Sequence, residues 1–363
     1  MAMVSANIGG GIVSFSFAFY HLGIFLGVII VLIMAICTHL ANILHLKVKD
    51  LTPRKYESMY ELAYLLYGRA SIFVVCINNG LTNLAIAIYS YIIIGETGRS
   101  FMTQFLVGNP SPGHEANLDN EEWWVKVACQ KSTTILIIGL ALIFTIFARQ
   151  MSELKWLSYT LIGILTAFIC LIFSLLISER AKVSETVDFE DLTRVKFDQY
   201  LMTSISVFMF GMSNQFMVFP TFNELEKRSN DRFCRVSFFS TLIYTIGFII
   251  VGVCGLLLFG SEIKPDLLEN VGKRPGIISI FIRISYCAVL LIQIPYYAFT
   301  VKEYTLVMLD EILNRSLSTH LEAKLAEFYN DKDAKNAGKL ATSNKPEKQM
   351  DHENENFNSI DTD

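Results

Sequence analysis

The stretch AMVSANIGGGIVSFSFAFY, residues 2–20, places three consecutive glycines, Gly9, Gly10 and Gly11, in the middle of an uncharged run. Glycine has the highest backbone cost in a helix of any residue except proline, so a triplet inside a membrane-length segment predicts a break in the helix. Backbone groups are not left unpaired in lipid, and an unwound stretch therefore needs protein, water or a bound solute as its partner. The triplet predicts a ligand site or, as the alternative, close packing between helices.

The composition of the whole chain indicates a membrane protein. Its 363 residues are 52% hydrophobic and 18% charged, and the mean hydropathy is +0.43. The net charge is only −4 and no basic tract is present, so a lipid bilayer is the expected partner and nucleic acid is not. The sequence shows no acid/base pair or metal-ligand motif at membrane depth, which argues against an enzyme and against a metal or other cofactor.

Eight segments of the chain are apolar enough to be transmembrane helices, each of which needs about 20 residues to cross about 30 Å of hydrocarbon. They predict an all-α polytopic membrane protein with a transmembrane domain over residues 1–315. The polar tail, residues 316–363, is expected to be cytoplasmic and disordered after a short helical start. The expected spans lie near residues 2–20, 23–46, 70–94, 132–148, 154–178, 200–220, 236–259 and 277–301.

A second interruption is predicted in the sixth of these segments. The stretch FMFGMSNQ, residues 208–215, places Gly211 and the polar Ser213 and Asn214 inside an apolar run that ends at Pro220. Two helices broken at comparable depth, one in each half of the chain, indicate a transporter binding site. The open N–H groups of a half-helix suit a carboxylate, and its open carbonyls suit a cation or an ammonium group.

These motifs resemble those of the amino acid/auxin permease family. Gly9-x-Gly11-Ile12-Val13 followed by Ala18-Phe19 is similar to the family's first-helix signature, and residues 210–225 are similar to its sixth helix. The resemblance covers about residues 2–315 and is closest to the sodium-coupled neutral amino acid transporters. It implies a leucine-transporter-like fold of two inverted repeats, and secondary transport of an amino acid by alternating access.

The resemblance also implies which residues bind the substrate. An amino acid is expected between the first, third, sixth and eighth segments, with its carboxylate at the first break and the sixth segment opposite. The implied substrate-binding residues are Gly9, Gly10, Gly11, Ile12, Phe210, Gly211, Ser213 and Asn214.

A coupling ion, either sodium or a proton, is implied at Ser5, Asn7 and Gln293. Ser5 stands where sodium-coupled members carry an asparagine, and Leu291 and Gln293 stand where they carry threonines. Proton coupling and facilitated transport therefore remain alternatives to sodium coupling.

The family carries further helices beyond the eight segments found here, so the expected fold is a truncated form. The alternative function is a non-transporting or structural membrane protein derived from such a carrier. A multi-pass location in the plasma membrane or the vacuolar or lysosomal membrane is expected, and the sequence leaves the oligomeric state open. Arg283, near one end of the eighth segment, is expected to extend its charge into water, with a functional charge as the minority alternative.

Overall fold

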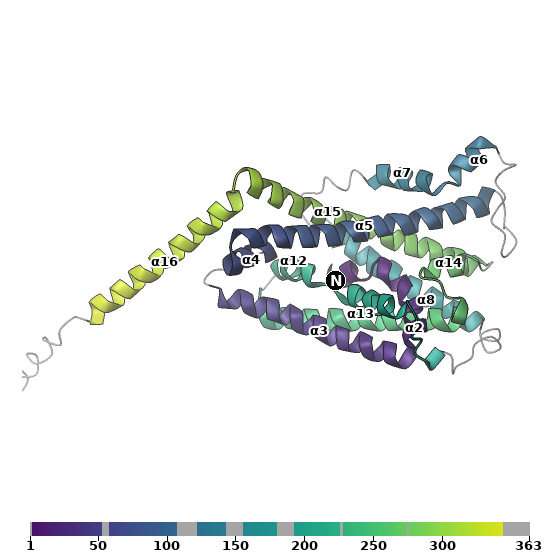
Figure 1. Cartoon of the computed structure of the whole chain (residues 1–363), viewed down its shortest axis with the longest axis horizontal. Coiled ribbons are helices and arrows are strands. Elements are labelled where there is room, and N and C mark those ends of the chain that lie inside the picture. The colour runs from purple at the N-terminus through teal and green to yellow at the C-terminus, as the bar shows by residue number, and fades with distance from the viewer. Residues whose placement is uncertain are drawn as a thin grey trace, which may run out of the picture.

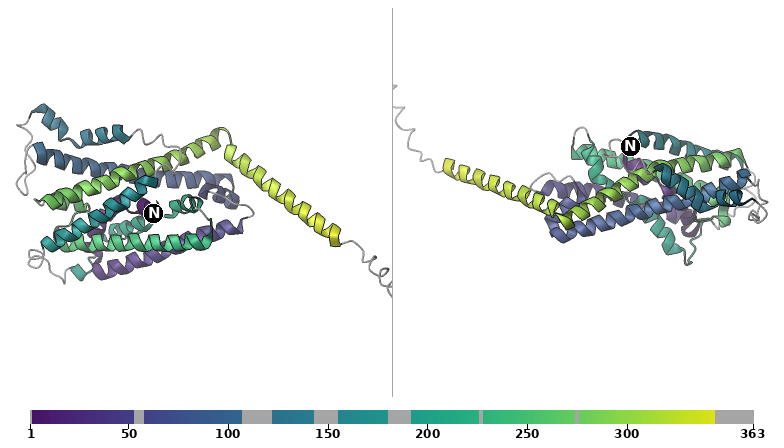
Figure 2. Two further views of the ribbon diagram at one scale, coloured as in Figure 1. Left: turned by 180° about the vertical axis from the view of Figure 1, so that it is seen from behind. Right: turned by 90° about the horizontal axis from the view of Figure 1, so that it is seen from above.

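The computed structural model describes residues 2–52, 58–106, 122–142, 155–179, 192–225, 228–273 and 276–343, and the regular structure in these ranges is helical. The helices run broadly along one direction and form an elongated bundle (Figure 1). One helix, α16 (Ser316–Ser343), projects from one end of the bundle in every view (Figure 2). Within the described ranges, six helices are long and apolar enough to cross a membrane. The predicted all-α polytopic membrane protein is thus confirmed.

The described helices follow the order of the predicted segments. The first segment is divided into α1 (Ala2–Asn7), the 3-10 helix η1 (Gly10–Ser14) and α2 (Phe15–Leu22), and the sixth into α11 (Leu201–Met212), η5 (Gln215–Met217) and α12 (Val218–Asn223). The other spans are α3 (Ile24–Leu51), α5 (Arg69–Leu106), α7 (Lys131–Leu142), α8 (Lys155–Ser178), α13 (Asn230–Phe259) and α15 (Ile277–Leu313). The connections contain α4 (Met59–Tyr67), α6 (Trp123–Ala128), η6 (Gly260–Glu262) and α14 (Leu267–Gly272).

Three helices extend further than hydropathy predicted. Helices α5 and α15 continue about three turns past the ends expected at residues 94 and 301, because polar residues end an apolar window without ending a helix. In the tail, α16 reaches Ser343, so its helical start is longer than expected, whereas residues 344–363 lie outside the described residues. The last six residues of the fourth expected span, 143–148, also lie outside them.

The helices pack in two groups. Helix α15 lies along α5 and against α8, and α5 also contacts α4 and α7. In the second group α2, α3, α11 and α13 pack on one another, while α8 contacts α13 and so joins the two groups. In Figure 1, α5 and α15 lie above α3 and α13, with the broken first segment between these layers. The first of the predicted substrate-binding segments therefore lies in the middle of the bundle, and the sixth contacts it through α11.

Small residues allow α2 to pack closely against its neighbours. The rings of Phe15 and Phe208 have centroids 4.9 Å apart. A Cβ placed on Gly211 would lie 2.6 Å from the Phe15 ring, and a Cβ on Gly252 would lie 2.5 Å from the Phe19 ring. These distances are too short for a side chain, so glycine at both positions lets the two phenylalanines of α2 contact α11 and α13.

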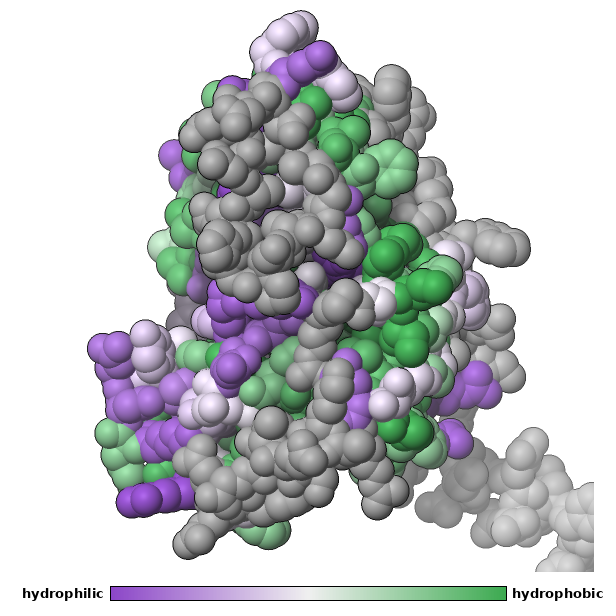
Figure 3. Space-filling model, turned by 90° about the vertical axis from the view of Figure 1, so that its right-hand side faces the viewer, coloured by the Kyte–Doolittle hydropathy of each residue, from purple (hydrophilic) through white to green (hydrophobic). Residues whose placement is uncertain are grey.

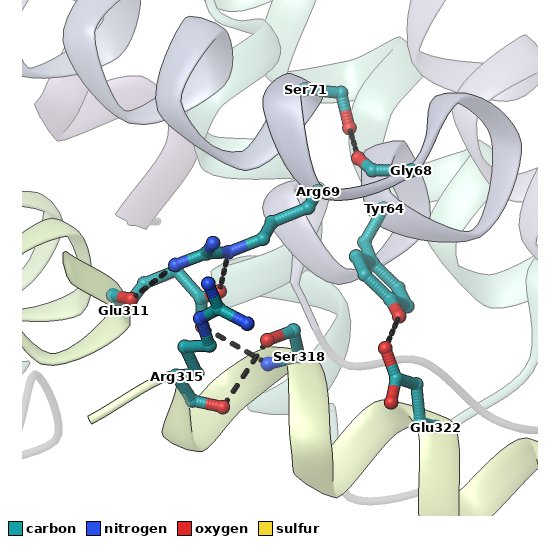
Figure 4. Close-up of polar contacts among 8 residues, drawn as sticks. All are labelled: Tyr64, Gly68, Arg69, Ser71, Glu311, Arg315, Ser318 and Glu322. Carbon is teal, nitrogen blue, oxygen red and sulfur yellow. Dashed lines mark hydrogen bonds and ion pairs between the residues drawn. The ribbon is translucent and has the colours of Figure 1, made fainter. Parts of the chain in front are cut away.

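A buried carboxylate joins three helices at the end of the bundle from which α16 projects (Figure 4). Glu311 on α15 is fully buried, and its Oε1 accepts a hydrogen bond of 2.6 Å from Arg69 Nε at the start of α5. Its Oε2 accepts a hydrogen bond of 3.0 Å from the backbone N–H of Ser318 on α16. Nearby, the Tyr64 hydroxyl donates to Glu322 Oε1 at 3.0 Å. Glu311 thus ties α16 to α5 and α15.

We expect Glu311→Ala to lower the free energy of unfolding by about 1–3 kcal/mol, because Arg69 and the Ser318 N–H lose their acceptor. Unfolding of the purified protein in detergent, followed by intrinsic fluorescence against denaturant, measures the change. Glu322→Ala, which removes one exposed hydrogen bond, is the matched control and is expected to change stability by less than about 0.5 kcal/mol. Equal losses in the two variants would contradict the role assigned to Glu311.

Candidate substrate-binding site

Both predicted helix breaks are present in the structure. In the first segment Ile8 and Gly9 lie between α1 and η1, and the Ile12 N–H donates to the Gly9 carbonyl at 3.2 Å. In the sixth segment α11 ends at Met212, and Ser213 and Asn214 precede η5. Both interruptions fall where glycine or small polar residues replace apolar ones, so the local sequence accounts for their positions.

The two breaks lie side by side. A Cβ placed on Gly11 would lie 3.8 Å from the Cα of Gly211. Gly211 in turn faces the Phe15 ring one helical turn after Gly11. The first and sixth segments thus approach backbone to backbone, and a side chain larger than hydrogen at Gly211 would separate them.

The backbone carbonyls opened by the first break are bonded by side chains from α15. Gln293 Nε2 donates to the Ile8 carbonyl oxygen at 2.6 Å, and the Tyr286 hydroxyl donates to the Gly9 carbonyl oxygen at 3.1 Å. A Cβ on Gly9 would lie 2.6 Å from Gln293 Oε1 and 2.9 Å from the Tyr297 hydroxyl, so α15 leaves no room for a side chain there. Helix α15 therefore satisfies the polar groups that lipid could not.

Polar side chains of α3 and α13 support the second break from its other side. Thr38 Oγ1 donates to the Met212 carbonyl oxygen at 3.0 Å. Asn42 Nδ2 donates to Asn214 Oδ1 at 3.0 Å, and Asn214 Nδ2 donates to the Tyr244 hydroxyl at 3.5 Å. Asn42, Asn214 and Tyr244 are completely buried. This buried network holds the sixth segment in its broken form.

Sequence reasoning missed several residues that support the breaks. Thr38 and Asn42 are four residues apart in the otherwise apolar α3, a spacing that places two polar groups on one helical face and that was available as a signal. Tyr286 had no such signal, because a tyrosine in an apolar helix is equally compatible with packing in the core or at the membrane interface.

The predicted substrate-binding residues divide into two sets. Gly9, Gly11, Ile12, Gly211 and Asn214 are brought together at the two breaks, and Gly10 begins η1 between them. The side chains of Phe210, which is 49% exposed, and of Ser213, whose Oγ donates to Gln215 Oε1, lie on the exposed face instead. Helix α11 continues as far as Met212, and its helical periodicity directs the Phe210 side chain outward. Both residues remain predicted substrate-binding residues.

The predicted ion-binding residues lie in two different surroundings. Gln293 is bonded to the Ile8 carbonyl, whereas Asn7 is 9% exposed and its Nδ2 has no hydrogen-bond partner among the described residues. The side chain of Ser5 lies outside the described residues. Over the described part of the chain, no three His, Cys, Asp or Glu side chains are grouped as metal ligands.

A carboxyl group with a raised pKa lies at the opposite end of the bundle from α16. Asp266 precedes α14, and its Oδ1 accepts a hydrogen bond of 2.9 Å from the Leu268 N–H. Burial raises the pKa of Asp266 to about 6, although that hydrogen bond acts in the opposite direction, and repulsion from Glu96 and Glu269 raises it further. The folded protein thus favours the protonated form more than the unfolded chain, whose aspartates have a pKa of about 3.9. The stabilisation that this carboxyl group contributes to folding is complete at pH values below its pKa in the unfolded chain. It is lost as the pH rises through its pKa in the folded protein.

We therefore expect wild type and Asp266→Asn to be similarly stable near pH ~4, and wild type to become the less stable of the two by pH ~7. Asparagine retains an oxygen that can accept from the Leu268 N–H but carries no titratable charge. Thermal unfolding of both proteins across this pH range gives the difference between their unfolding midpoints. The contributions of the other titrating groups are largely the same in both proteins and cancel in this difference. A difference that does not change with pH would contradict the raised pKa.

The hydrogen bond from Tyr286 to the first break gives a second prediction. Tyr286→Phe removes only the hydroxyl that donates to the Gly9 carbonyl, and we expect it to lower the free energy of unfolding by about 0.5–1.5 kcal/mol. Tyr159→Phe on the exposed face of α8 is the matched control, since its side chain is 63% exposed. Denaturant unfolding of wild type and the two variants measures the change. Equal stabilities of the two variants would contradict the role assigned to Tyr286.

Two broken helices that meet inside a helical membrane bundle are the arrangement found in the class of membrane transporters with paired discontinuous helices. The chain belongs to the family described as transmembrane amino acid transporter protein, whose model matches residues 1–359. The resemblance to amino acid permeases is thereby confirmed, and the family is one of transporters, not of enzymes.

Two relatives agree with this family assignment. The chain is 24% identical over 323 residues to the protein "Amino acid transporter AVT6E" of Arabidopsis thaliana, in a match that covers 85% of this chain and 62% of that protein. It is 26% identical over 273 residues to "Vacuolar amino acid transporter 7" of Saccharomyces cerevisiae, covering 74% of this chain and 50% of the yeast protein. The matches thus span between half and two thirds of the length of these relatives.

Proposed function

We propose that the chain forms a secondary carrier that moves amino acids, in particular neutral ones, across a membrane by ion-coupled alternating access. The observation that carries the proposal is the approach of Gly11 to Gly211, which joins the two broken helices in the middle of the bundle. Membership of the amino acid transporter family supplies the substrate class. The inverted-repeat arrangement of the two halves is part of the same proposal.

In this proposal the amino acid binds between the two breaks. The N–H groups at the start of η1 suit its carboxylate, since the first N–H groups of a helical turn have no partner within that turn. Gly11 and Gly211 keep side chains out of the space where the two backbones meet. A substrate with a neutral side chain is favoured, because the residues at the two breaks carry no charge. They are Gly9, Gly11, Ile12, Gly211 and Asn214.

A proton is the coupling ion that we propose. The Ile8 and Gly9 carbonyl oxygens, which would be ligands of a sodium ion at the first break, accept hydrogen bonds from Gln293 and Tyr286. A sodium ion would have to displace both donors. A vacuolar membrane, named in the description of the yeast relative, is the proposed location. Uptake driven by a pH gradient without sodium supports this part of the proposal, and uptake that requires a sodium gradient overturns it.

Uptake of labelled neutral amino acids into proteoliposomes tests the transport function itself. We expect Gly211→Leu to abolish saturable uptake, because a side chain would collide with Phe15 and separate the two breaks. Gly163→Leu is the matched control, because a Cβ at that glycine of α8 meets no described atom within 4 Å, and uptake should remain within about twofold of wild type.

Unchanged uptake in Gly211→Leu would remove the proposed site. Binding of the labelled amino acid to the purified protein separates a carrier from a structural membrane protein, since only a carrier should show binding that other neutral amino acids compete away.

A further inference from the structure

Arg283 of α15 is a buried cation whose hydrogen-bond partners are neutral. Its side chain is only 2% exposed, so the charge does not extend into water as the sequence suggested. Nη1 donates to Ser100 Oγ at 2.9 Å, and Nη2 donates to Gln104 Oε1 at 2.7 Å. The guanidinium carbon also lies 4.5 Å from the centroid of the Phe101 ring. All three of these partners belong to α5, and none carries a negative charge.

Arg283 also has unused hydrogen-bonding capacity. Its Nε is buried and has no acceptor among the described residues. The ion pairs of the described residues join other partners, and none involves Arg283. A buried charge without a counter-charge costs several kcal/mol, and the guanidinium of an arginine keeps its charge in proteins. The missing partner of Arg283 is therefore an anion.

The position of Arg283 relates this missing anion to the first break. Tyr286 and Gln293, which bond the Gly9 and Ile8 carbonyls, follow Arg283 by three and ten residues, which places all three on one face of α15. Three residues of helix correspond to a rise of about 4.5 Å, so Arg283 lies about one turn from the break, on the side of α14. A solute that entered from this end would meet Arg283 before it reached Gly9.

The end of the bundle beside Arg283 is polar and closed in this structure. A Cβ on Gly272, the last residue of α14, would lie 3.5 Å from Arg283 Nη1, so the end of α14 covers the guanidinium. Hydrophilic side chains gather on the described part of this end face (Figure 3). An anion would reach Arg283 from this face when α14 moves aside.

We propose that Arg283 is an anion-binding site on the path to the first break, and that it takes the carboxylate of the incoming amino acid. The guanidinium can present Nε and one Nη together to the two oxygens of a carboxylate. Such a pair replaces the hydrogen bond to the neutral Gln104 amide by two bonds to a negatively charged acceptor. The amino acid then passes from Arg283 to the first break. This inference rests on the proposed transport function for the identity of the anion.

Kinetics of uptake in proteoliposomes provide the first test. Arg283→Gln should raise the KM for a neutral amino acid by about tenfold or more with the maximal rate within about twofold, because one charge-assisted bond is lost before translocation. Arg283→Lys, which keeps the charge without the planar fork, should show a smaller rise. Arg99→Gln is the matched control, an exposed arginine of α5 beside Ser100, and it should leave KM unchanged. A KM that does not change in Arg283→Gln overturns the proposal.

A second test measures anion binding without transport and remains valid if the wild type shows no uptake. We expect acetate, but not neutral acetamide, to raise the thermal unfolding midpoint of wild type and of Gly211→Leu at matched ionic strength. The same addition should leave Arg283→Gln unchanged. Protection by chloride but not by acetate would overturn the carboxylate assignment in favour of an inorganic anion, and no anion effect would overturn the site. Absent uptake together with acetate protection would instead reject only the transport function.

Discussion

The fold depends on how the open backbone groups of two broken helices are bonded in a place where water cannot reach them. In the first segment the Ile8 and Gly9 carbonyls accept hydrogen bonds from Gln293 and Tyr286 of α15. Without Gln293 the buried Ile8 carbonyl would lose its hydrogen-bond donor, at a cost of about 1–3 kcal/mol, whereas the Gly9 carbonyl would keep only the Ile12 N–H. Because α15 packs along α5 and α8, those helices indirectly position the first break.

The second break is supported in the same way by a different group of helices. Thr38 of α3 donates to the Met212 carbonyl, and Asn42 bonds the side chain of Asn214. The first break is thus held by α15 and the second by α3 and α13, while Gly11 and Gly211 bring the two together. The two broken segments are held by different groups of helices, so a movement of one group relative to the other would change the shape of the site between them. Such a movement is what the proposed alternating access requires.

Several features could be predicted from the sequence alone. Hydropathy predicted the apolar spans, and the glycine triplet and the Gly211 region predicted one break in each segment, which the structure places at Ile8 and Gly9 and at Ser213 and Asn214. Helix ends were less accurate, since α5 and α15 continue through polar residues beyond the apolar window. The exposure of the Phe210 and Ser213 side chains could not be read from the sequence, although both residues belong to the second broken segment. Their direction depends on the phase of α11, and apolar residues on several faces of that helix left this phase undetermined.

The sequence by itself determined where the chain enters the membrane and where its helices break, since hydropathy and the backbone cost of glycine act among neighbouring residues. Only the tertiary structure decided what completes each break. Gln293 and Ile8 are separated by 285 residues, yet their atoms approach to 2.6 Å. The burial of Arg283 also depends on tertiary packing. Its partners Ser100 and Gln104 belong to α5, and the sequence of α15 does not specify that α5 lies there. A hydrogen bond requires a distance and a direction, and across helices both are set by packing alone.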